Sequence, residues 1–382
     1  MSMFLLDAHL DLAMNAMEWN RDLRQPLEEV RKREADWTDK PDRGRGVLTF
    51  DEMRRGQIGL CVATQIARYV KPSNPLKGWH SPHQAWAQTQ AQLAWYQSME
   101  EEGHLLQITT REQLDQHVDT WTQACRSGDT KGMMRDLPIG YVLSLEGADS
   151  MISTAYVHKA YEKGLRAIGL GHYGPGTYAP GTNAEGGLSR AGKDLLHEMG
   201  SLGMILDLTH LSDQAFWEAI DLYQGPIWAS HCNCRSLIPH QRQLSDEQIK
   251  AIVQRGGVIG VVLDAWMMHP NWKRGETTPE SACLKLERII DHIDHMAQLS
   301  GDVDHVGIGS DLDGGYGTEQ CPMDVQSIAD LQLLETLLKE RGYSHTQCEQ
   351  IFHHNFLRFT PGTRIEAVHA AIKPLVKSPF LR

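Results

Sequence analysis

Imidazole and carboxylate side chains directly follow short apolar runs at six places in the chain. The residues are His9 with Asp11, Glu146, His172, His210, His231 and Asp311. Nitrogen and oxygen ligands without thiolates suit zinc, manganese or iron, and a carboxylate that bridges allows two metal ions to bind together. Two divalent ions about 3.5 to 4 Å apart hold and deprotonate a water between them. These residue types therefore indicate a metal-dependent hydrolase.

The spacing of His9 and Asp11 supports this interpretation. Side chains two positions apart lie on the same face of a strand, so His9 and Asp11 point the same way while Leu10 points into the wall. A single histidine among the 19 in the chain is far more often a surface or hydrogen-bonded residue than a ligand. The argument for a ligand rests on position, because acid or imidazole at six of eight run ends would be a rare accident.

Three carboxylates have a structural alternative to a role in the site. Glu146 could be a helix-start carboxylate stabilised by the helix dipole. Asp311 and Asp313, in the segment 309–315, could be turn residues. That alternative is strong for Asp313 and weaker for Asp311, so only Asp311 is counted among the candidate site residues.

Eight apolar runs bounded by glycine, proline or charge must position these side chains. They cover residues 3–8, 59–67, 139–145, 166–171, 204–209, 226–230, 257–263 and 305–310. Several are apolar continuously, as expected of strands that are covered on both faces, and segments with helical periodicity such as 284–299 lie between them. Eight such units predict an α/β fold, a (β/α)8 TIM barrel. In that fold the carboxyl ends of the strands meet at one mouth.

Two gaps between the runs are too long for a simple crossover, so insertions are expected after strands 1 and 2. Residues 14–58 are predicted to be a long loop over the mouth, with a charged part at 19–46 that is poor in core residues. Residues 68–138 are predicted to be a helical insertion, with helices around 82–103 and 111–135. Residues 1–382 are interpreted as a single metal-dependent hydrolase barrel domain.

Composition narrows the class of protein. The 382 residues include 37 basic and 49 acidic side chains, and the net charge of −12 argues against nucleic acid or an anionic membrane as a partner. We find no basic leader at the start and no apolar run near the ~18 residues of a membrane span. Seven scattered cysteines suit free thiols, which predicts a cytoplasmic location.

Six segments together resemble one known family, in the order in which that family carries its motifs. The chain is similar to the renal (membrane) dipeptidase family of zinc peptidases, peptidase family M19, within the amidohydrolase superfamily of metal-dependent TIM barrels. The similar segments are D-x-H-x-D-L at 7–12, E-G at 146–147, D-L-[ST]-H at 207–210, S-H at 230–231, G-x-G-S-D-x-D-G at 307–314 and N-F-L-R at 355–358.

This resemblance implies a role for each candidate. His9 and Asp11 would bind one zinc ion, His210 and His231 would bind a second, and Glu146 would bridge the two. His172 would polarise the scissile carbonyl on the substrate side. The guanidinium of Arg242 would hold the C-terminal carboxylate of the substrate, and Asp311 would pass a proton from water to the leaving amine.

The chain departs from the family pattern on the substrate side. Leu10 replaces an asparagine, which should matter little because the residue points away from the metals. Residues 61–66 after the second strand, residues 263–266 after the seventh, and Gln243 and Ser245 beside Arg242 also differ. Substrate preference is therefore less constrained than the metal site.

The sequence thus predicts a dizinc metallo-dipeptidase that cleaves the amide of short dipeptides by a metal-bridged hydroxide, with a D-residue at the C-terminal position as an option. One alternative keeps the barrel and the two zinc ions but acts on a non-peptide amide or a lactone. Another is a non-catalytic, metal-stabilised binding protein. A dipeptide-like molecule is the expected partner, and a homodimer is compatible with the resemblance.

Overall fold

A computed structural model describes residues 3–71, 74, 76–127 and 136–359. Its centre is a sheet in which all paired strands are parallel. Most of these strands are rich in apolar residues and buried along their whole length, as expected of strands with helices or side chains on both faces. The strands are β1 (Leu5–Leu10), β2 (Ile58–Gln65), β3 (Leu105–Gln107), β4 (Ile139–Leu145), β5 (Leu165–Gly169), β6 (Ile205–Asp207), β7 (Ile227–Ala229), β8 (Val258–Val261) and β9 (Val306–Ile308).

Eight of these strands close into a barrel. The order runs β2, β1, β9, β8, β7, β6, β5, β4, and β4 pairs back onto β2 from Leu60 opposite Gly140 to Gln65 opposite Leu145. The closed parallel barrel with surrounding helices confirms the predicted (β/α)8 fold. Every one of the eight predicted runs overlaps one of these eight strands.

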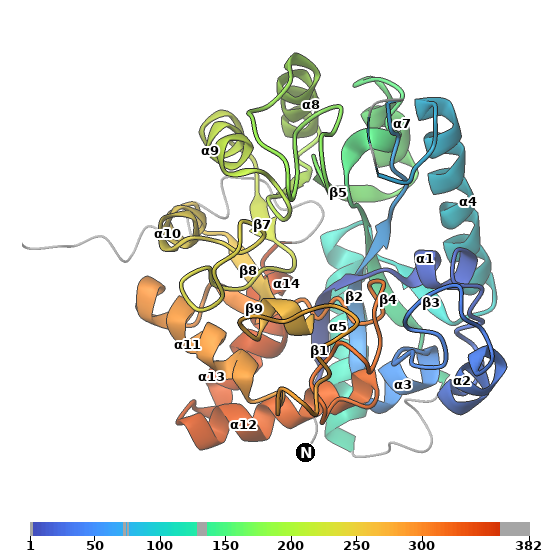
Figure 1. Ribbon diagram of the computed structural model, residues 1–382, viewed down its shortest axis with the longest axis vertical. Helices are drawn as coiled ribbons and strands as arrows, with labels where there is room; N and C mark the ends of the chain where they lie inside the picture. Colours follow the sequence, from blue (N-terminus) through green and yellow to red (C-terminus); the bar gives the residue numbers. More distant parts are fainter. Residues whose placement is uncertain (1–2, 72–73, 75, 128–135, 360–382) are drawn as a thin grey trace, which may run out of the picture.

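Helices surround the barrel, and Figure 1 shows α8, α9, α10, α11 and α12 in succession around the strands. Serine caps begin several of them; the hydroxyl of Ser189, for example, accepts the backbone N–H of Gly192. The helices are α1 (Leu12–Met17), α2 (Leu27–Glu34), α3 (Phe50–Arg55), α4 (Pro82–Glu101), α5 (Arg111–Ser127), α7 (Tyr156–Glu162), α8 (Arg190–Ser201), α9 (Asp213–Leu222), α10 (Asp246–Gln254), α11 (Arg288–Ser300), α12 (Leu333–Arg341), α13 (His345–Glu349) and α14 (Asn355–Leu357). Short helical turns are η1 (Ala148–Ser150), η2 (Ala265–Met267), η3 (Ile328–Gln332) and η4 (Gln350–His354).

The segment after β2 contains the two helices that the sequence predicts, α4 and α5, and one strand that it does not. Residues 128–135, the expected end of the second helix, lie outside the described residues. The strand β3 pairs with the first half of β4, while β5 pairs with the second half. Three residues are too few for a recognisable periodicity, so the sequence could not reveal β3.

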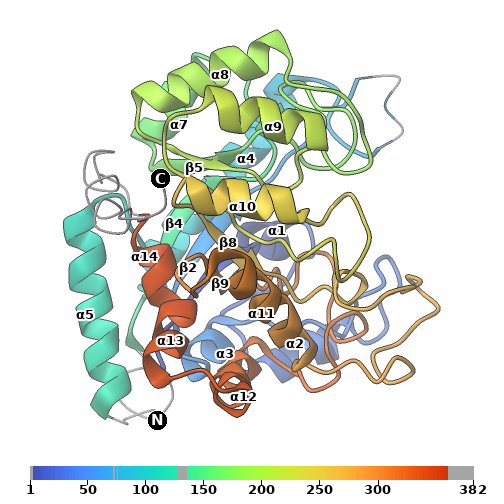
Figure 2. The ribbon, with the colours of Figure 1, turned by 90° about the vertical axis from the view of Figure 1, so that its left-hand side faces the viewer.

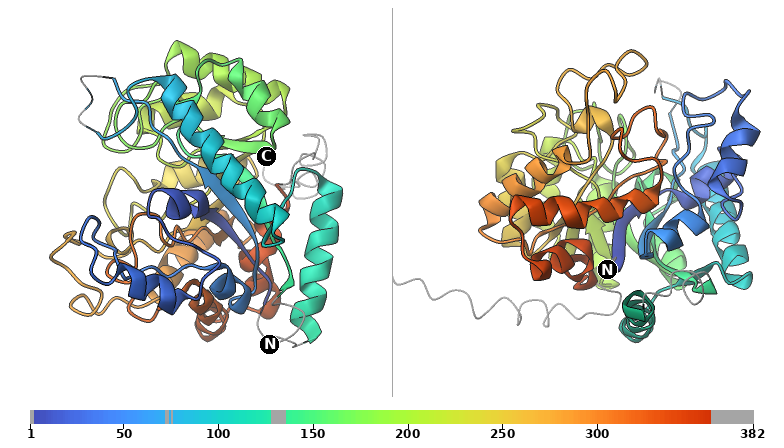
Figure 3. Two further views of the ribbon diagram at one scale, coloured as in Figure 1. Left: turned by 90° about the vertical axis from the view of Figure 1, so that its right-hand side faces the viewer. Right: turned by 90° about the horizontal axis from the view of Figure 1, so that it is seen from below.

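Helix α5 covers the end of the barrel opposite the loops, as Figures 2 and 3 show. His117 Nε2 lies 2.7 Å from the carbonyl oxygen of Gly59 at the start of β2 and 3.1 Å from the amide nitrogen of Gly140 at the start of β4. The buried ring of Trp121 packs against Gly59, where a side chain would clash. The opposite, carboxyl ends of the strands thus remain open to the loops that carry the candidate residues.

The prediction of a long loop over 14–58 is wrong. The segment holds the end of α1 and all of α2 and α3, and its charged residues are not simply solvated. Arg21 is buried and forms ion pairs with Glu34 and Asp42, both at 2.9 Å, and a longer one of 3.6 Å with Asp313. The segment has few apolar residues, but several of its charged side chains are buried and pair with one another.

Among the described residues, we find no helix that is long and apolar enough to span a membrane.

Candidate metal centre

Seven predicted site residues lie at the carboxyl ends of barrel strands. His9 is the next-to-last residue of β1, and Asp11 follows the strand directly. Glu146 follows β4, while His172, His210, His231 and Asp311 come two or three residues after β5, β6, β7 and β9. The closed barrel therefore brings side chains from six strands to one mouth, and Leu10 between His9 and Asp11 is fully buried in the wall.

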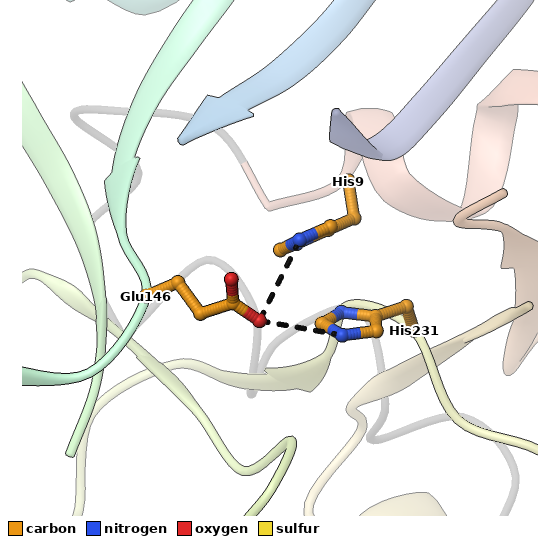
Figure 4. A group of neighbouring side chains, drawn as sticks. All are labelled: His9, Glu146 and His231. Carbon is orange, nitrogen blue, oxygen red and sulfur yellow. Dashed lines mark ion pairs between the residues drawn. The ribbon is translucent and has the colours of Figure 1, made fainter. Parts of the chain in front are cut away.

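One oxygen of Glu146 is the centre of the group. Glu146 Oε1 lies 3.2 Å from His210 Nε2, 3.4 Å from His231 Nε2, 3.6 Å from His9 Nε2 and 3.8 Å from His172 Nε2. Figure 4 shows how the rings of His9 and His231 point toward this carboxylate from different strands. A single carboxylate oxygen thus faces four imidazole nitrogens, an arrangement that suits the binding of a cation.

A second group of ligand atoms adjoins the first through His9. His9 Nε2 lies 3.9 Å from Asp11 Oδ1 and 3.9 Å from Asp311 Oδ1. The three residues His9, Asp11 and Asp311 offer ligand atoms that all lie within 4.8 Å of one another. The hydroxyl of Thr64, on β2, donates a hydrogen bond to Asp11 and fixes its carboxylate.

Hydroxyl groups hold the far nitrogen of each central ring. Thr182 Oγ1 lies 2.8 Å from His210 Nδ1, and Ser230 Oγ lies 2.8 Å from His231 Nδ1 and 3.4 Å from His9 Nδ1. Partners of this kind fix the orientation and tautomer of metal-binding histidines. All three rings are thereby aimed with Nε2 toward Glu146.

Buried aspartates fix the backbone that carries these rings. Asp7 Oδ1 accepts the N–H groups of His9 and Ser310, at 3.1 and 2.9 Å, and so ties the end of β1 to that of β9. Asp207 Oδ1 does the same for Thr209 and Ser230, at 3.0 and 3.1 Å, between β6 and β7. The strand ends are therefore cross-linked at the depth of the site.

Two of the candidate residues adopt a backbone conformation that most residues avoid. The φ angle is 69° at His210 and 58° at Asp311. Left-handed conformations at residues other than glycine cost roughly 1 to 3 kcal/mol and cluster at functional sites. Their presence at two candidate positions fits a site whose geometry is fixed for chemistry.

Burial changes the protonation of the whole group. Removal from water lowers the pKa of His9 to about 3, with a further contribution from the charge of Arg242, and it lowers the pKa values of His210 and His231 well below the ordinary range. Burial raises the pKa of Asp11 to about 6 and that of Glu146 well above its ordinary value. Burial therefore favours neutral imidazoles, and it disfavours charge on the clustered carboxylates unless a cation lies beside them.

A cavity of about 220 Å³ adjoins the cluster. His172, Arg242 and Asp311 line it, together with Asp264, Trp266 and Arg274 from the segment after β8. Arg242 is buried, and its guanidinium donates to the carbonyl oxygen of His231 at 2.9 Å and to Cys232 Sγ at 3.1 Å. These two bonds use two of its five N–H groups and hold the side chain at the cavity.

Comparison with known proteins agrees with this geometry. The model of the membrane dipeptidase family, peptidase family M19, matches residues 1–373. The chain belongs to this family. The match confirms the predicted family and, with it, the prediction of a hydrolase that acts on peptide bonds.

Individual relatives are more distant. The protein in the pqqA 5′ region of Klebsiella pneumoniae is 30% identical over 262 residues, 66% of this chain and 93% of that protein. The dipeptidase tcpJ of Claviceps purpurea is 32% identical over 193 residues, 50% of this chain but only 41% of its own length. A metallopeptidase from Rhodobacter sphaeroides, solved with a phosphinate mimic of the dipeptide L-Ala-D-Ala, superposes with a TM-score of 0.71 at 22% identity and covers 94% of this chain and 98% of its own. The similarity to the Rhodobacter structure supports the barrel fold.

The side chains at the candidate site of this member of the membrane dipeptidase family suit the binding of a metal ion. His9 Nε2 is fully buried and has no hydrogen-bond partner within the described part of the chain. An orphaned imidazole nitrogen that faces a carboxylate is costly unless a cation lies between them. Imidazole and carboxylate ligands without a thiolate suit a divalent ion such as zinc. The family of metallopeptidases and the groups of ligand atoms agree on a metal centre.

The sequence analysis did not identify several residues that contact the candidate site. Thr182 and Ser230 orient the rings, Thr64 fixes Asp11, and Arg68 contacts His172. Ser230 directly precedes His231, so its motif could have drawn attention to it. Thr182 and Arg68 reach the site from loops whose course the sequence does not reveal.

Proposed function

We propose that the chain is a dizinc dipeptidase that hydrolyses the amide bond of short dipeptides with a free C-terminal carboxylate. The observation that carries this proposal is the convergence of the Nε2 atoms of His9, His210 and His231 on one oxygen of Glu146, at 3.6, 3.2 and 3.4 Å. Membership of a dipeptidase family supports the reaction class.

Two zinc ions are proposed to share the site. His9 and Asp11 would hold one ion, His210 and His231 would hold the other, and Glu146 would contact both. When bound, such ions supply Lewis-acid polarisation of a carbonyl and lower the pKa of water. Three groups of ligand atoms overlap at His9 and Glu146, which supports a binuclear rather than a mononuclear site.

The side chains around the metals have separate proposed tasks. His172 donates a hydrogen bond to the scissile carbonyl oxygen as negative charge develops there. Asp311 accepts a proton from the attacking water and delivers it to the leaving amine. The raised pKa of Asp311, caused first by burial and then by Asp11 and Glu146, supports a carboxylate that can hold a proton between the two steps.

Arg242 is proposed to bind the substrate's terminal carboxylate. Its buried guanidinium lines the cavity and still has N–H groups to offer a carboxylate in a paired geometry. The cavity of about 220 Å³ suits a dipeptide rather than a longer peptide. The dipeptide mimic L-Ala-D-Ala in the Rhodobacter relative supports a D-residue at the second position as a substrate feature to test.

Residues 1–382 are proposed to form one barrel domain that acts in the cytoplasm. All seven cysteines are free in the structure, which suits a reducing compartment. A homodimer is proposed by resemblance alone, and sedimentation of the purified protein tests it.

Elemental analysis of the purified protein, joined to a screen of L,L and L,D dipeptides before and after chelation, tests the proposed function. We expect two zinc equivalents per chain and cleavage that a chelator abolishes. Two metals without dipeptide cleavage would favour the non-peptide amide or lactone alternative. Absence of metal binding, even after reconstitution, would refute the metal centre.

A further inference from the structure

Arg68, which follows β2, contacts the ring of His172. Its guanidinium Nη2 lies 2.5 Å from His172 Nδ1. A guanidinium can only donate hydrogen bonds, so Nδ1 must be the acceptor and carry no proton. A ring that accepts at Nδ1 is neutral and carries its single proton on Nε2. The identity of the partner therefore determines the tautomer of His172.

This tautomer decides what His172 can do. Its Nε2 lies 3.8 Å from Glu146 Oε1 and belongs, with His210, to a group of atoms close enough to share a metal. A protonated Nε2 has no lone pair for a metal, but it is a hydrogen-bond donor. His172 is thus a donor at the edge of the metal centre and not one of its ligands.

Other contacts hold His172 in the same orientation. Its carbonyl oxygen accepts the N–H of Thr182 at 2.7 Å, and its ring packs edge-on against Tyr173 and His210 with centroids 4.9 and 4.5 Å apart. These contacts place the ring but leave Nδ1 to Arg68. The backbone and the neighbouring rings alone would allow either tautomer.

Placing Arg68 here is costly, which argues for a role. Its Nε is buried without a hydrogen-bond partner among the described residues, and the hydrogen bond from Nη1 to the carbonyl oxygen of Lys77 is long, at 3.4 Å. The side chain is half-buried, and the carboxylates of Asp149 and Glu146 only partly offset the cost of removing its charge from water. The family resemblance assigns no task to Arg68.

We propose that Arg68 is a positioning residue that holds His172 as the Nε2–H tautomer and aims this N–H at the carbonyl oxygen of the substrate. The proposal rests on the proposed dipeptidase function. The nearby positive charge also strengthens Nε2–H as a donor, because it withdraws electron density from the ring through Nδ1.

Kinetics of Arg68 variants of the zinc-loaded enzyme test this proposal. Arg68→Met removes the donor, and we expect kcat to fall roughly 10- to 100-fold, the usual effect of losing a partner that orients a site histidine. KM, zinc content and Tm should change little. Arg68→Lys keeps a group that can only donate, so it should recover much of kcat. The exposed Arg190 at the start of α8 supplies the control Arg190→Met, expected to match the wild type.

A kcat of Arg68→Met equal to that of the wild type would overturn the proposal, as would a lysine variant no better than the methionine variant. Nitrogen-15 NMR of labelled histidine in the wild-type enzyme, with His172 assigned by comparison with His172→Gln, gives a readout that needs no Arg68 variant. We expect the proton on Nε2; a proton on Nδ1 or a metal-bound Nε2 contradicts the proposal. If the wild type cleaves no dipeptide, the proposed function fails, and the NMR result alone decides the role of Arg68.

Discussion

The Nε2 atoms of His210 and His231 lie 3.3 Å apart, and Glu146 Oε1 lies within 3.4 Å of both. At this distance the two nitrogens either share one proton or bind a common cation. The hydroxyl groups at both Nδ1 atoms can accept the ring protons there and leave each Nε2 unprotonated, and the adjacent carboxylate then favours a cation. The stability of the fold should therefore depend on metal.

Removing the metal is the first test of this dependence. A ligand that binds only the folded state adds about 4 kcal/mol to the free energy of unfolding when its free concentration is 1,000 times its dissociation constant. We expect chelation to lower Tm measured by circular dichroism, and zinc to restore it. Identical melting curves for the metal-free and zinc-loaded protein would contradict a metal at His210 and His231.

Replacing Asp311 tests proton transfer separately from metal binding. Asp311→Asn keeps the size of the side chain and its tolerance of the left-handed φ of 58°. The amide cannot accept and return a proton, so kcat should fall by roughly 10²- to 10⁴-fold. Zinc content from elemental analysis should stay at the wild-type value. An active Asp311→Asn enzyme would refute the proposed role.

Replacing Arg242 tests recognition of the carboxylate. Hydrogen bonds to charged groups contribute about 1.5 to 3 kcal/mol, so Arg242→Ala should raise KM by roughly one to two orders of magnitude and lower kcat less. Arg242→Lys keeps the charge but loses the planar guanidinium that can pair with both carboxylate oxygens. Its KM should lie between that of the wild type and that of Arg242→Ala. Steady-state kinetics on one dipeptide checks all three enzymes, and an unchanged KM in the alanine variant would count against the assignment.

The barrel and the position of the ligands could be predicted because both depend on local patterns. A continuously apolar run such as 257–263 indicates a doubly covered strand whatever its neighbours are, and β8 (Val258–Val261) lies inside it. His9 and Asp11 could be assigned to one face from their spacing alone. The barrel fold then implies that residues at strand ends meet, even where the sequence separates them by hundreds of residues.

The contacts that the sequence could not predict are made by residues in loops. Thr182 reaches His210, and Arg68 reaches His172 across 104 positions of sequence, through loops without periodicity. Asp313 was interpreted mainly as a turn residue, and its φ of 61° fits a turn. Its carboxylate, however, also accepts the N–H groups of Val47 and Leu48 at 2.9 to 3.0 Å, which no local pattern indicates.

The buried ion cluster around Arg21 gives a stability prediction with a matched control. Removing one partner of a buried charge network leaves an uncompensated charge and costs about 3 to 5 kcal/mol. We expect this loss for Arg21→Met, because its side chain is fully buried between Glu34 and Asp42. Arg24, three positions on, is 40% exposed and pairs with Glu102, so Arg24→Met should cost at most about 1 kcal/mol. Denaturant unfolding compares the two, and equal losses would mean that the cluster around Arg21 contributes no more than a surface pair.

His292 on α11 gives a prediction of pH dependence away from the metal centre. Its Nδ1 accepts the backbone N–H of Cys234 at 3.1 Å. Burial, with a smaller contribution from Arg288, lowers its pKa to about 3, against about 6.5 in the unfolded chain. Between these values the unfolded state binds the proton and the folded state does not. This contribution to stability is therefore fully present above about pH 6.5 and is lost as the pH falls toward 3.

Replacing His292 should remove that part of the acid sensitivity. At one pH unit below its unfolded pKa, a single group that is protonated only in the unfolded state lowers the free energy of unfolding by about 1.4 kcal/mol. His292 alone should therefore lower the free energy of unfolding of the wild type by about that much between pH 7.5 and pH 5.5. His292→Asn offers an amide oxygen to the same N–H and does not titrate. Denaturant unfolding at the two pH values should show a drop that is smaller in the variant by about 1.4 kcal/mol. Other titrating groups, including the metal ligands, act equally on both proteins, so drops of equal size would show that His292 is not buried as a neutral ring.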